Sequence, residues 1–462
     1  MVSIIIFILI LSILVLIHEL GHFIMAKRAG IGVEEFGFGL PPRAWGKKIK
    51  GTIYSLNWLP FGGFVRLVGE DPTDKNKNEK NSFYVKSILQ RTGVVVAGVV
   101  MNLLLAVIIF YFVIFALGFK VVVPRIIDYN FAATTQSQHA VVFSASKNPD
   151  LIDSGELILR LDNKKVENSN EIYDLIKSSE GKLFEIELEN SNENYAKKTT
   201  QVSFLPQPYI LSVVKDSVAE KAGIKDNDVL VSIDGEIIAT TEELINRIRS
   251  SEGKELTIVL YNLSDNQKRE VKAVPSVDAN GKVALGIEIG EILMVSDHMI
   301  TRQTAFDNKI EGISVGDAYK LTYQNPSEKI LSGFTHSYNI LAYSMKVFGQ
   351  LIGYSIREKD VTLVSEGVSG PVGIAQVTSQ AVALGPISVL QLMALLSLNL
   401  AFINILPLPA LDGGRFFFII VEAVTRRKVY PSLEKWVHTI GFALLLALTL
   451  LITYNDIAKL IR

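Results

Sequence analysis

Two histidines and a glutamate near the N-terminus have the spacing of a metal-binding helix. His18 and His22 lie four residues apart, so on a helix their imidazoles share one face. Two imidazoles at that spacing can bind one zinc ion, with Glu19 beside them as a general base. The alternative is a histidine pair hydrogen-bonded between helices. The position inside a long apolar run favours the metal site, because ionisable groups within a membrane are costly and usually functional.

A carboxylate in a second apolar run is the candidate third ligand. Asp412 is the only acidic residue between Gly367 and Glu422, and in apolar surroundings it needs a cation or a proton as its partner. A catalytic zinc takes three protein ligands and keeps one position open. Asp412 would complete that set with the two histidines, whereas an ion pair with Arg415 is the alternative.

The residues around Asp412 interrupt the helix that this run would otherwise form. Pro407 and Pro409 remove backbone donors and clash with the preceding turn, so the carboxylate can face inward. Both prolines are also candidate substrate-binding residues. Asn404 is a candidate catalytic residue that would hydrogen-bond the oxyanion or the scissile peptide, and a hydrogen bond between helices is its alternative.

Four apolar runs are long enough to cross the roughly 30 Å of hydrocarbon in a membrane. They cover residues 2–26, 94–119, 387–421 and 440–454. The first run has no basic segment before it and no small-residue cleavage site, so we expect a retained span rather than a signal peptide. The third must be irregular because of its prolines, and irregular backbone survives in a membrane only where it is buried or lines a cavity.

The distribution of basic residues predicts the orientation. Lysine and arginine gather between spans one and two and between spans three and four, which places both links in the cytoplasm. The long middle of the chain and both termini then lie outside. His22 is five residues from Lys27, so the metal would lie near the cytoplasmic face. With a net charge of −1 and no cysteine among 462 residues, the chain offers no basic field for nucleic acid, no disulfide and no cysteine-ligated zinc.

The middle of the chain contains an internal repeat. Residues 154–190 match residues 226–262 at an offset of 72, and each copy has the pattern of strand, turn, helix and strand. The second copy and the residues before it look like a bacterial PDZ domain, a module that binds peptide ends by adding them to a sheet edge. We therefore predict PDZ domains at 120–205 and 206–292, with peptide C-termini as ligands of the second. The first copy lacks the Ala-Gly step of the pattern, and two spacer domains without ligands are the alternative.

Two further segments have amphipathic or β-rich patterns. The segment 293–385 contains apolar residues at helical spacing within 327–358, which favours a helix on the outer membrane surface over a fifth span. The segment 52–60 is rich in β-favouring residues, and glycines follow it. We predict that it pairs edge-on with an unwound substrate near the zinc. The candidate substrate-binding residues there are Tyr54, Ser55, Gly62 and Gly63, and a purely structural hairpin is the alternative.

Taken together, these motifs resemble the site-2 protease family of intramembrane zinc metalloproteases. The resemblance rests on HELGH at 18–22 and NILPLPALDGG at 404–414, with GFG at 37–39, FGGFV at 61–65, GPVGI at 370–374 and the PDZ pair between spans two and three. It implies one catalytic zinc held by His18, His22 and Asp412, with Glu19 activating water. It also implies a multi-pass protein of the bacterial inner membrane with its PDZ domains in the periplasm. Its substrates would be single-span proteins, namely trimmed anti-sigma factors and remnant signal peptides, cut in regulated intramembrane proteolysis.

The expected fold is therefore a four-span α-helical metalloprotease core with a membrane-associated β-hairpin and two inserted tandem PDZ domains. Its parts are 1–119 with spans one and two, 120–205, 206–292, 293–385 on the membrane surface, and 386–462 with spans three and four. A PDZ-based binding and quality-control module with a structural metal is the rival function, although a structural zinc usually has four protein ligands. A zinc transporter is a second rival, but spans two and four contain no acid or histidine.

Overall fold

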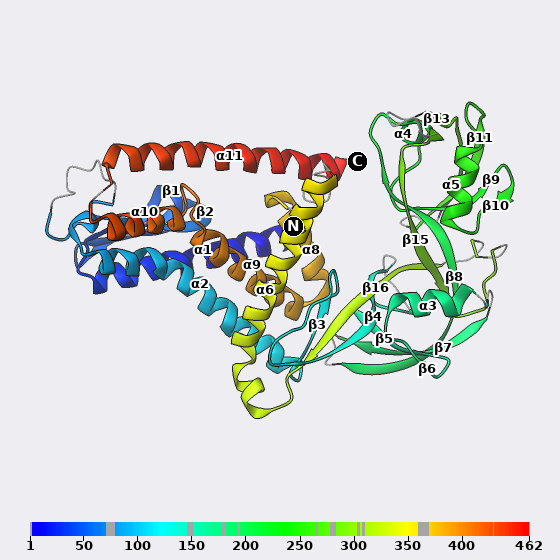
Figure 1. The fold of residues 1–462 in the computed structure, drawn as a ribbon, viewed down its shortest axis with the longest axis horizontal. Helices are drawn as coiled ribbons and strands as arrows, with labels where there is room; N and C mark the ends of the chain where they lie inside the picture. Colours follow the sequence, from blue (N-terminus) through cyan, green and yellow to red (C-terminus); the bar gives the residue numbers. More distant parts are fainter. Residues whose placement is uncertain are drawn as a thin grey trace. The chain divides into compact units, whose positions relative to one another are not determined.

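The computed structural model describes residues 2–70, 79–145, 151–177, 179, 182–191, 195–263, 267–277, 283–302, 305–306, 310–358, 369–427 and 429–461. The chain divides into two compact units. One unit comprises residues 1–116 and 325–461 and is mainly helical, and the other comprises residues 117–324 and is mainly β-sheet (Figure 1).

The helical unit contains the four candidate membrane spans. Its helices are α1 (Val2–Arg28), α2 (Ile88–Ala116), α6 (Pro326–Glu358), α8 (Pro371–Leu384), α9 (Pro386–Ile405), α10 (Asp412–Thr425) and α11 (Pro431–Ile461), with a 3-10 turn η2 at Phe83–Val85. Among the described residues, four helices are long and apolar enough to cross a membrane: α1, α2, α9 and the Ser432–Tyr454 part of α11. The third expected span, 387–421, is two helices, α9 and α10, separated by an irregular segment at 406–411.

Helix α2 is the centre of this unit, because α1, α6, α9 and α10 all pack against it. Gly21 of α1 lies so close to α2 that a Cβ there would stand 2.4 Å from the carbonyl oxygen of Ala97. A partly buried ion pair between Arg91 of α2 and Glu422 of α10, with a distance of 2.8 Å, joins α10 to α2. These contacts hold α1 and α10 against the same helix, so segments almost 400 residues apart in the sequence lie close together.

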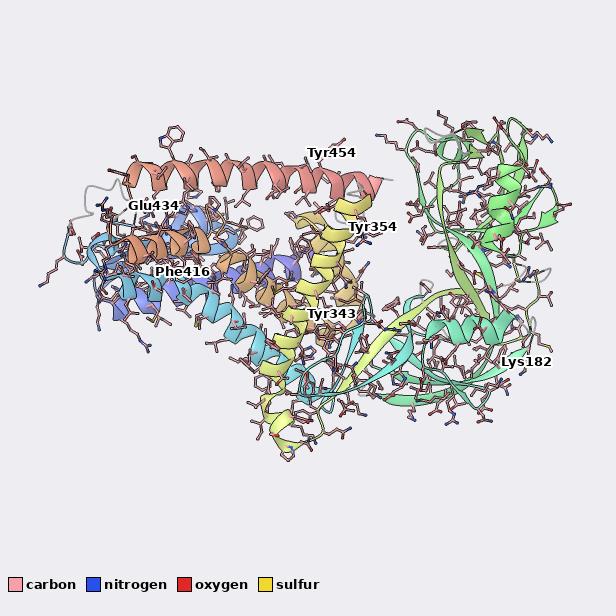
Figure 2. All side chains as sticks on the ribbon, in the orientation of Figure 1. Lys182, Tyr343, Tyr354, Phe416, Glu434 and Tyr454 are labelled. Atoms are coloured by element: carbon pink, nitrogen blue, oxygen red, sulfur yellow. The ribbon has the colours of Figure 1, made fainter. Side chains whose placement is uncertain are left out.

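Helix α6 packs along α2 through a partly polar face. Gly333 lies against the backbone of α2 at Val107, and the ring of His336 meets the ring of Phe110 edge-on at 4.8 Å. Exposed apolar side chains such as Phe334 cover the rest of the helix, and Tyr343 and Tyr354 mark its course in Figure 2. The helix is not among the candidate spans of the described chain. Its placement on the membrane surface stays a prediction.

The segment between α1 and α2 forms a doubly folded hairpin of β1 (Val33–Ile49) and β2 (Thr52–Leu67). Residues 35–38 are paired on one side with 63–66 and on the other with 53–56, while 43–49 pair with 52–57. Four segments therefore lie side by side in the order 61–67, 33–38, 52–57 and 43–49. Arg43 forms an ion pair with Glu35 at 2.6 Å. Burial alone would raise the pKa of the Glu35 carboxyl. The hydrogen bond and charge of the Arg43 guanidinium have the larger combined effect, so this pKa lies below its usual value.

The second unit confirms the internal repeat. In the first copy, β5 (Glu156–Leu161), β6 (Lys164–Lys165), α3 (Ser169–Lys177) and β7 (Leu183–Asn190) follow in order; in the second copy, β9 (Asp228–Ile233), β10 (Glu236–Ile237), α5 (Thr241–Arg249) and β11 (Leu256–Asn262) do the same. The starts of the first three pairs of elements lie at the predicted offset of 72. Each copy has its own hydrophobic core, and Ile158, Ile172 and Ile186 of the first occupy the positions of Leu230, Leu244 and Ile258 of the second.

Long strands link the two copies into one sheet. Its remaining strands are β3 (Lys120–Pro124), β4 (Thr135–Ala145), β8 (Ala196–Val213), β12 (Gln267–Ala273), β15 (Ile287–Ser296) and β16 (Glu311–Thr322), while α4 (Val218–Ala222) and the small pair β13 (Ser276–Val277) and β14 (Val283–Ala284) flank the second copy. The main path through the sheet is β12-β11-β9-β8-β15-β16-β4-β5-β6. Strands β8 and β15 pair over most of their length, and β16 returns to pair with β3 and β4 of the first copy.

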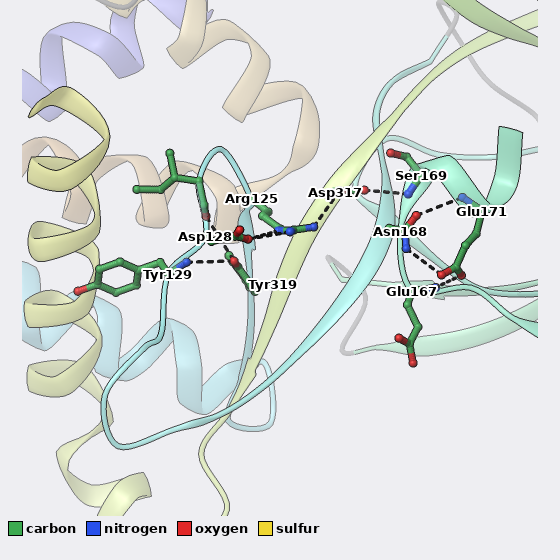
Figure 3. Close-up of polar contacts among 10 residues, drawn as sticks. Arg125, Asp128, Tyr129, Glu167, Asn168, Ser169, Glu171, Asp317 and Tyr319 are labelled. Carbon is green, nitrogen blue, oxygen red and sulfur yellow. Dashed lines mark hydrogen bonds and ion pairs between the residues drawn. The ribbon is translucent and has the colours of Figure 1, made fainter. Parts of the chain in front are cut away.

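Strand β16 corrects the expected boundary of the membrane-surface segment. Asp317 of β16 accepts hydrogen bonds from the backbone N–H of Ser169 at 2.8 Å and from Arg125 at 3.2 Å, and the Tyr319 hydroxyl accepts from the N–H of Tyr129 (Figure 3). Residues up to 322 are thus part of the sheet unit, and the boundary lies at 324/325 rather than at 292/293. The strand was hard to predict because it pairs with β15 only through its first residues, and the partners of the rest, β3 and β4, lie far earlier in the sequence.

Candidate metal centre

Three side chains from the two apolar segments converge on one point. His18 Nε2 lies 2.9 Å from Asp412 Oδ2, and His22 Nε2 lies 3.1 Å from the same oxygen. The two Nε2 atoms are 3.1 Å apart. Both histidines are buried in α1, and Asp412 is the first residue of α10. The structure thus brings the three predicted ligands together.

The geometry of this cluster fits a tetrahedral metal ion with one open position. Zinc bonds of about 2.0–2.2 Å at tetrahedral angles place ligand atoms roughly 3.3–3.5 Å apart. The three observed separations need to widen by only a few tenths of an ångström to reach that range. Two imidazole nitrogens and one carboxylate oxygen are also the donor set that a catalytic zinc prefers. The residues therefore fit the ion that the sequence predicts.

The break before α10 aims the carboxylate at the histidines. Leu406 is extended, as expected for a residue before proline, and Ala410 has a positive φ of 72° before the chain re-enters a helix at Asp412. The carbonyl groups of this segment fold over the first turn of α10. A Cβ at Gly413 would stand 2.0 Å from the oxygen of Leu406. Glycine at this position is therefore required by space rather than by backbone freedom.

Glu19 stands beside the cluster and makes a contact of its own. Its Oε2 atom accepts a hydrogen bond of 3.0 Å from the backbone N–H of Val65 in the hairpin. The metal cluster of the described residues comprises His18, His22 and Asp412 without it. Glu19 lines the same cavity as His22 and Asp412. It is thus a nearby carboxylate outside the ligand set, which is where a general base belongs.

A cavity of about 750 Å³ opens beside the cluster. The hairpin contributes residues 64–67 to its wall, the irregular segment contributes Ala410 and Leu411, and α11 contributes a group of polar residues that includes Glu434 and His438. Figure 2 shows Glu434 near the start of α11. The cavity is large enough to admit water and an extended stretch of polypeptide to the cluster.

Arg415 does not pair with Asp412 in the described structure. Its guanidinium forms an ion pair with Glu70, which also accepts a hydrogen bond from the N–H of Leu67. The sequence offered an Asp412–Arg415 pair as the alternative to a metal ligand. That pair is not formed, because Arg415 pairs with Glu70 instead, and both of these residues line the cavity.

The predicted substrate-binding residues are only partly brought to the site. Tyr54 is paired with Phe36 on one side and with Lys47 on the other, and Ser55 is enclosed in the same way. Residues 53–56 of the predicted segment 52–60 are therefore paired on both sides and offer no free edge, whereas the sheet edge beside the cavity is 61–67. Gly62 and Gly63 lie in that edge segment and pack against α1.

The remaining candidates lie on either side of the helix break. Asn404 is half-buried in the last turns of α9, and it is not among the residues of the described chain that line the cavity. Pro409 packs against Gly441 of α11, where a Cβ would stand 2.1 Å from the proline Cβ. Pro407 is exposed. Their roles in binding or catalysis stay predictions.

Three residues that were not predicted from the sequence contact the predicted ligands or the segment before Asp412. The carbonyl of Val94 lies 2.8 Å from His22 Nδ1, and Asn102 Nδ2 lies 3.3 Å from His18 Nδ1. His438 of α11 accepts a hydrogen bond of 3.0 Å from the N–H of Ala410. Asn102 could have been identified from the sequence, because it is a polar amide in an apolar helix and such a group in a membrane span requires a hydrogen-bond partner. Nothing local marks the Val94 carbonyl.

The chain is similar to several known proteins. Residues 6–448 match the sequence model of peptidase family M50. The zinc metalloprotease RasP of Bacillus licheniformis is 28% identical over 485 aligned positions, which cover 99% of each chain. The regulator of sigma-E protease RseP of Escherichia coli is 27% identical over 471 positions, covering 98% of each. Among solved structures, the PDZ domain of an SdrC-like protein from Listeria monocytogenes aligns with 18% of this chain and 86% of its own, at 22% identity and a TM-score of 0.17.

Proposed function

The chain belongs to peptidase family M50 and is a zinc metalloprotease of the site-2 class, and on that premise we propose that His18, His22 and Asp412 bind one catalytic zinc ion while Glu19 is the general base. The observation that carries this proposal is the convergence of three donor atoms from residues up to 394 positions apart. Each of these residues is ionisable and lies in an otherwise apolar segment. Such residues are costly in a membrane and are usually functional, so their convergence is not expected by chance.

The chemistry divides between the ion and the protein. When bound, zinc polarises the scissile carbonyl and makes water nucleophilic near neutral pH. Glu19 takes a proton from the attacking water onto a carboxylate oxygen and delivers it to the leaving amide nitrogen. The cavity beside Glu19 supplies the water. Asn404 would hydrogen-bond the oxyanion after a rearrangement of the end of α9.

The chain is an inner-membrane protein, and we place its active site near the cytoplasmic face. Lys27 and Arg28 end α1 one to two turns beyond His22, and basic residues also follow α10, so the positive-inside rule supports this placement. The exposed Trp45 and Trp58 of the hairpin suit a segment that touches lipid at the interface. Both termini and the sheet unit would then lie in the periplasm.

The proposed substrates are single-span membrane proteins, and trimmed anti-sigma factors and remnant signal peptides are the specific classes. A transmembrane helix hides its peptide bonds, so it must unwind before it is cut, and its freed N–H and C=O groups need new partners. The edge segment 61–67 borders the cavity and could supply them by strand addition. We therefore assign strand addition to Val65 and its neighbours rather than to Tyr54 and Ser55, because only the former lie at the sheet edge beside the cavity.

The sheet unit would contribute substrate selection. The order of elements in the second copy, with α4 before β9 and α5 between β10 and β11, suits a PDZ domain that binds peptide C-termini by strand addition. The first copy repeats the central elements without a counterpart of the short helix α4 among its described residues. We propose that the tandem pair screens the periplasmic parts of candidate substrates and that the second copy binds exposed ends.

Fragment mapping tests the proposed reaction directly. The full chain in detergent is incubated with a single-span substrate, and the products are identified by mass, with and without a chelator. We expect cleavage within the transmembrane segment that stops with the chelator and returns with added zinc. A chain that binds the substrate but yields no fragments under any zinc concentration would instead be a binding module with a structural metal.

A further inference from the structure

Both histidines of the metal cluster pack against one face of helix α2. Val94, Gly98 and Asn102 are spaced four residues apart, so they follow one another along one face of the helix. A Cβ at Gly98 would stand 2.6 Å from both imidazole rings. The rings therefore lie directly on the helix backbone at Gly98, with Val94 on one side and Asn102 on the other.

The two neighbours of Gly98 offer different hydrogen-bonding chemistry. The Val94 carbonyl, 2.8 Å from His22 Nδ1, can only accept a hydrogen bond. It therefore keeps the proton of His22 on Nδ1 and leaves the Nε2 lone pair free for a metal. Asn102 is fully buried, and its side-chain amide faces His18 Nδ1. An amide offers both a donor and an acceptor, so it can serve either tautomer of His18.

The two ends of the Asn102 amide are unequally used. Its Nδ2 atom faces His18 Nδ1 at 3.3 Å, and its Oδ1 atom is buried without a hydrogen-bond partner among the described residues. With Nδ2 of Asn102 as the donor, Nδ1 of His18 would be the acceptor, and the proton of a neutral His18 would then lie on Nε2, from which it can donate to Asp412. When Nε2 binds a metal instead, the proton of a neutral imidazole moves to Nδ1, which then needs an acceptor. Rotation of the amide by 180° brings Oδ1 to that position with almost no change of shape.

We propose that Asn102 is a positioning residue that holds His18 in the tautomer required for zinc binding, through an Nδ1–H to Oδ1 hydrogen bond formed by rotation of its amide. This inference rests on the proposed zinc site. Outer partners of metal-bound histidines fix ring orientation and tautomer, and their loss typically weakens metal binding by about 10–100-fold. The backbone of Asn102 is itself held, since its carbonyl accepts a hydrogen bond of 2.8 Å from Ser397 of α9.

Three variants of the full chain in detergent test this inference by zinc affinity, measured in competition with a chelator. Asn102→Leu keeps the approximate volume but removes the acceptor, and we expect zinc to bind about 10–100-fold more weakly. Asn102→Asp keeps an acceptor facing Nδ1–H, and we expect zinc to bind at least as tightly as in the wild type. Ser337→Ala is the control, because Ser337 is buried and its hydroxyl donates a hydrogen bond to the carbonyl of Gly333 within α6; zinc affinity should be unchanged.

The outcomes separate this inference from the proposed function. Wild-type affinity in folded Asn102→Leu would overturn the role of Asn102 while leaving the zinc site intact. If Asn102→Leu does not fold, the Asn102→Asp variant decides, since a loss of zinc affinity of tenfold or more there would equally overturn it. Failure of the wild-type chain to bind stoichiometric zinc, or zinc binding that survives His18→Ala, would instead reject the proposed metal site.

Discussion

The backbone N–H of Val65 donates a hydrogen bond of 3.0 Å to Oε2 of Glu19. The proposed general base and the proposed substrate-binding edge are therefore in direct contact. Two positions on, the N–H of Leu67 is held in the same way by Glu70. Carboxylates thus occupy two N–H groups of the edge that an incoming strand would need. A substrate strand that pairs there would displace Glu19 from Val65 and leave its carboxylate available to water.

Glu19→Gln should retain zinc and abolish cleavage. Glutamine can keep the hydrogen bond to Val65 with its amide oxygen, but it cannot accept a proton, and loss of general base catalysis typically costs about 10²–10⁴-fold in rate. Elemental analysis of the purified variant and fragment formation on a gel would measure the two quantities. Unchanged turnover in this variant would contradict the assignment of Glu19 as the base.

Asp412→Asn should lower zinc affinity sharply, because a neutral amide oxygen replaces a charged ligand. Glu422→Gln is the matched control: it is the next acidic residue of the same helix, and it pairs with Arg91 rather than with the cluster. We expect full zinc occupancy in the control and loss of zinc from Asp412→Asn on dialysis against a mild chelator. Retention of zinc by both variants would mean that the third ligand lies elsewhere.

The metal cluster was predictable because its signals are local. His18 and His22 follow helical periodicity, and Asp412 is a lone acid in an apolar run broken by prolines. Each of these features needs only a few neighbouring residues to be read. Their meeting also follows from chemistry, since a catalytic zinc needs three donors and the two segments offer three. The four candidate spans were predictable for the same reason, as composition alone reveals them.

Strand pairing was the part that sequence could not supply. The segments 33–49 and 52–67 each have a β-favouring pattern, but which segment lies at the edge depends on contacts between residues up to 34 positions apart, such as Val33 and Leu67. The bend that lets Arg43 reach Glu35 turns 52–57 into an inner strand. Strand β16 was missed for a similar reason, because two of its three partners, β3 and β4, lie far earlier in the sequence. Register is set by packing and turn geometry that local patterns do not encode.

Asp456→Ala should destabilise the helical unit by about 0.5–2 kcal/mol, the usual cost of losing a helix cap. The buried Asp456 carboxylate near the end of α11 accepts a hydrogen bond of 2.8 Å from the N–H of Gly373 in the first turn of α8. A Cβ at Gly370 would stand 2.8 Å from the same carboxylate, so the GPVGI motif leaves room for this acid. Thr449→Ala, which loses only a bond within α11, is the control, and thermal unfolding in detergent measures the difference. Equal melting temperatures would show that the cap contributes no stability.

Disulfide trapping can locate the edge that binds substrate. The chain has no cysteine, so single-cysteine variants give an unambiguous signal. Arg66 lines the cavity at the inner edge, whereas Lys47 lies in the outermost segment, beyond Tyr54. With zinc removed by a chelator, a bound substrate stays uncut, and a cysteine near the centre of its span should form a disulfide with Arg66→Cys. We expect little or none with Lys47→Cys or Tyr54→Cys, because those positions lie across the sheet from the cavity.

Variants of this substrate with helix-breaking residues in the span test whether unwinding limits the reaction. Helix-breaking glycine or proline in the substrate span lowers the cost of exposing one peptide bond, since fewer internal hydrogen bonds are lost. Both the yield of the Arg66→Cys disulfide and the cleavage rate of the wild-type chain should therefore rise with such substitutions. The Tyr54→Cys variant provides the baseline for nonspecific collision. If disulfides form equally at Tyr54→Cys and Arg66→Cys, or if helix-breaking substrates are cut no faster, then strand addition at residues 61–67 is not how this protein holds the bond that it cuts.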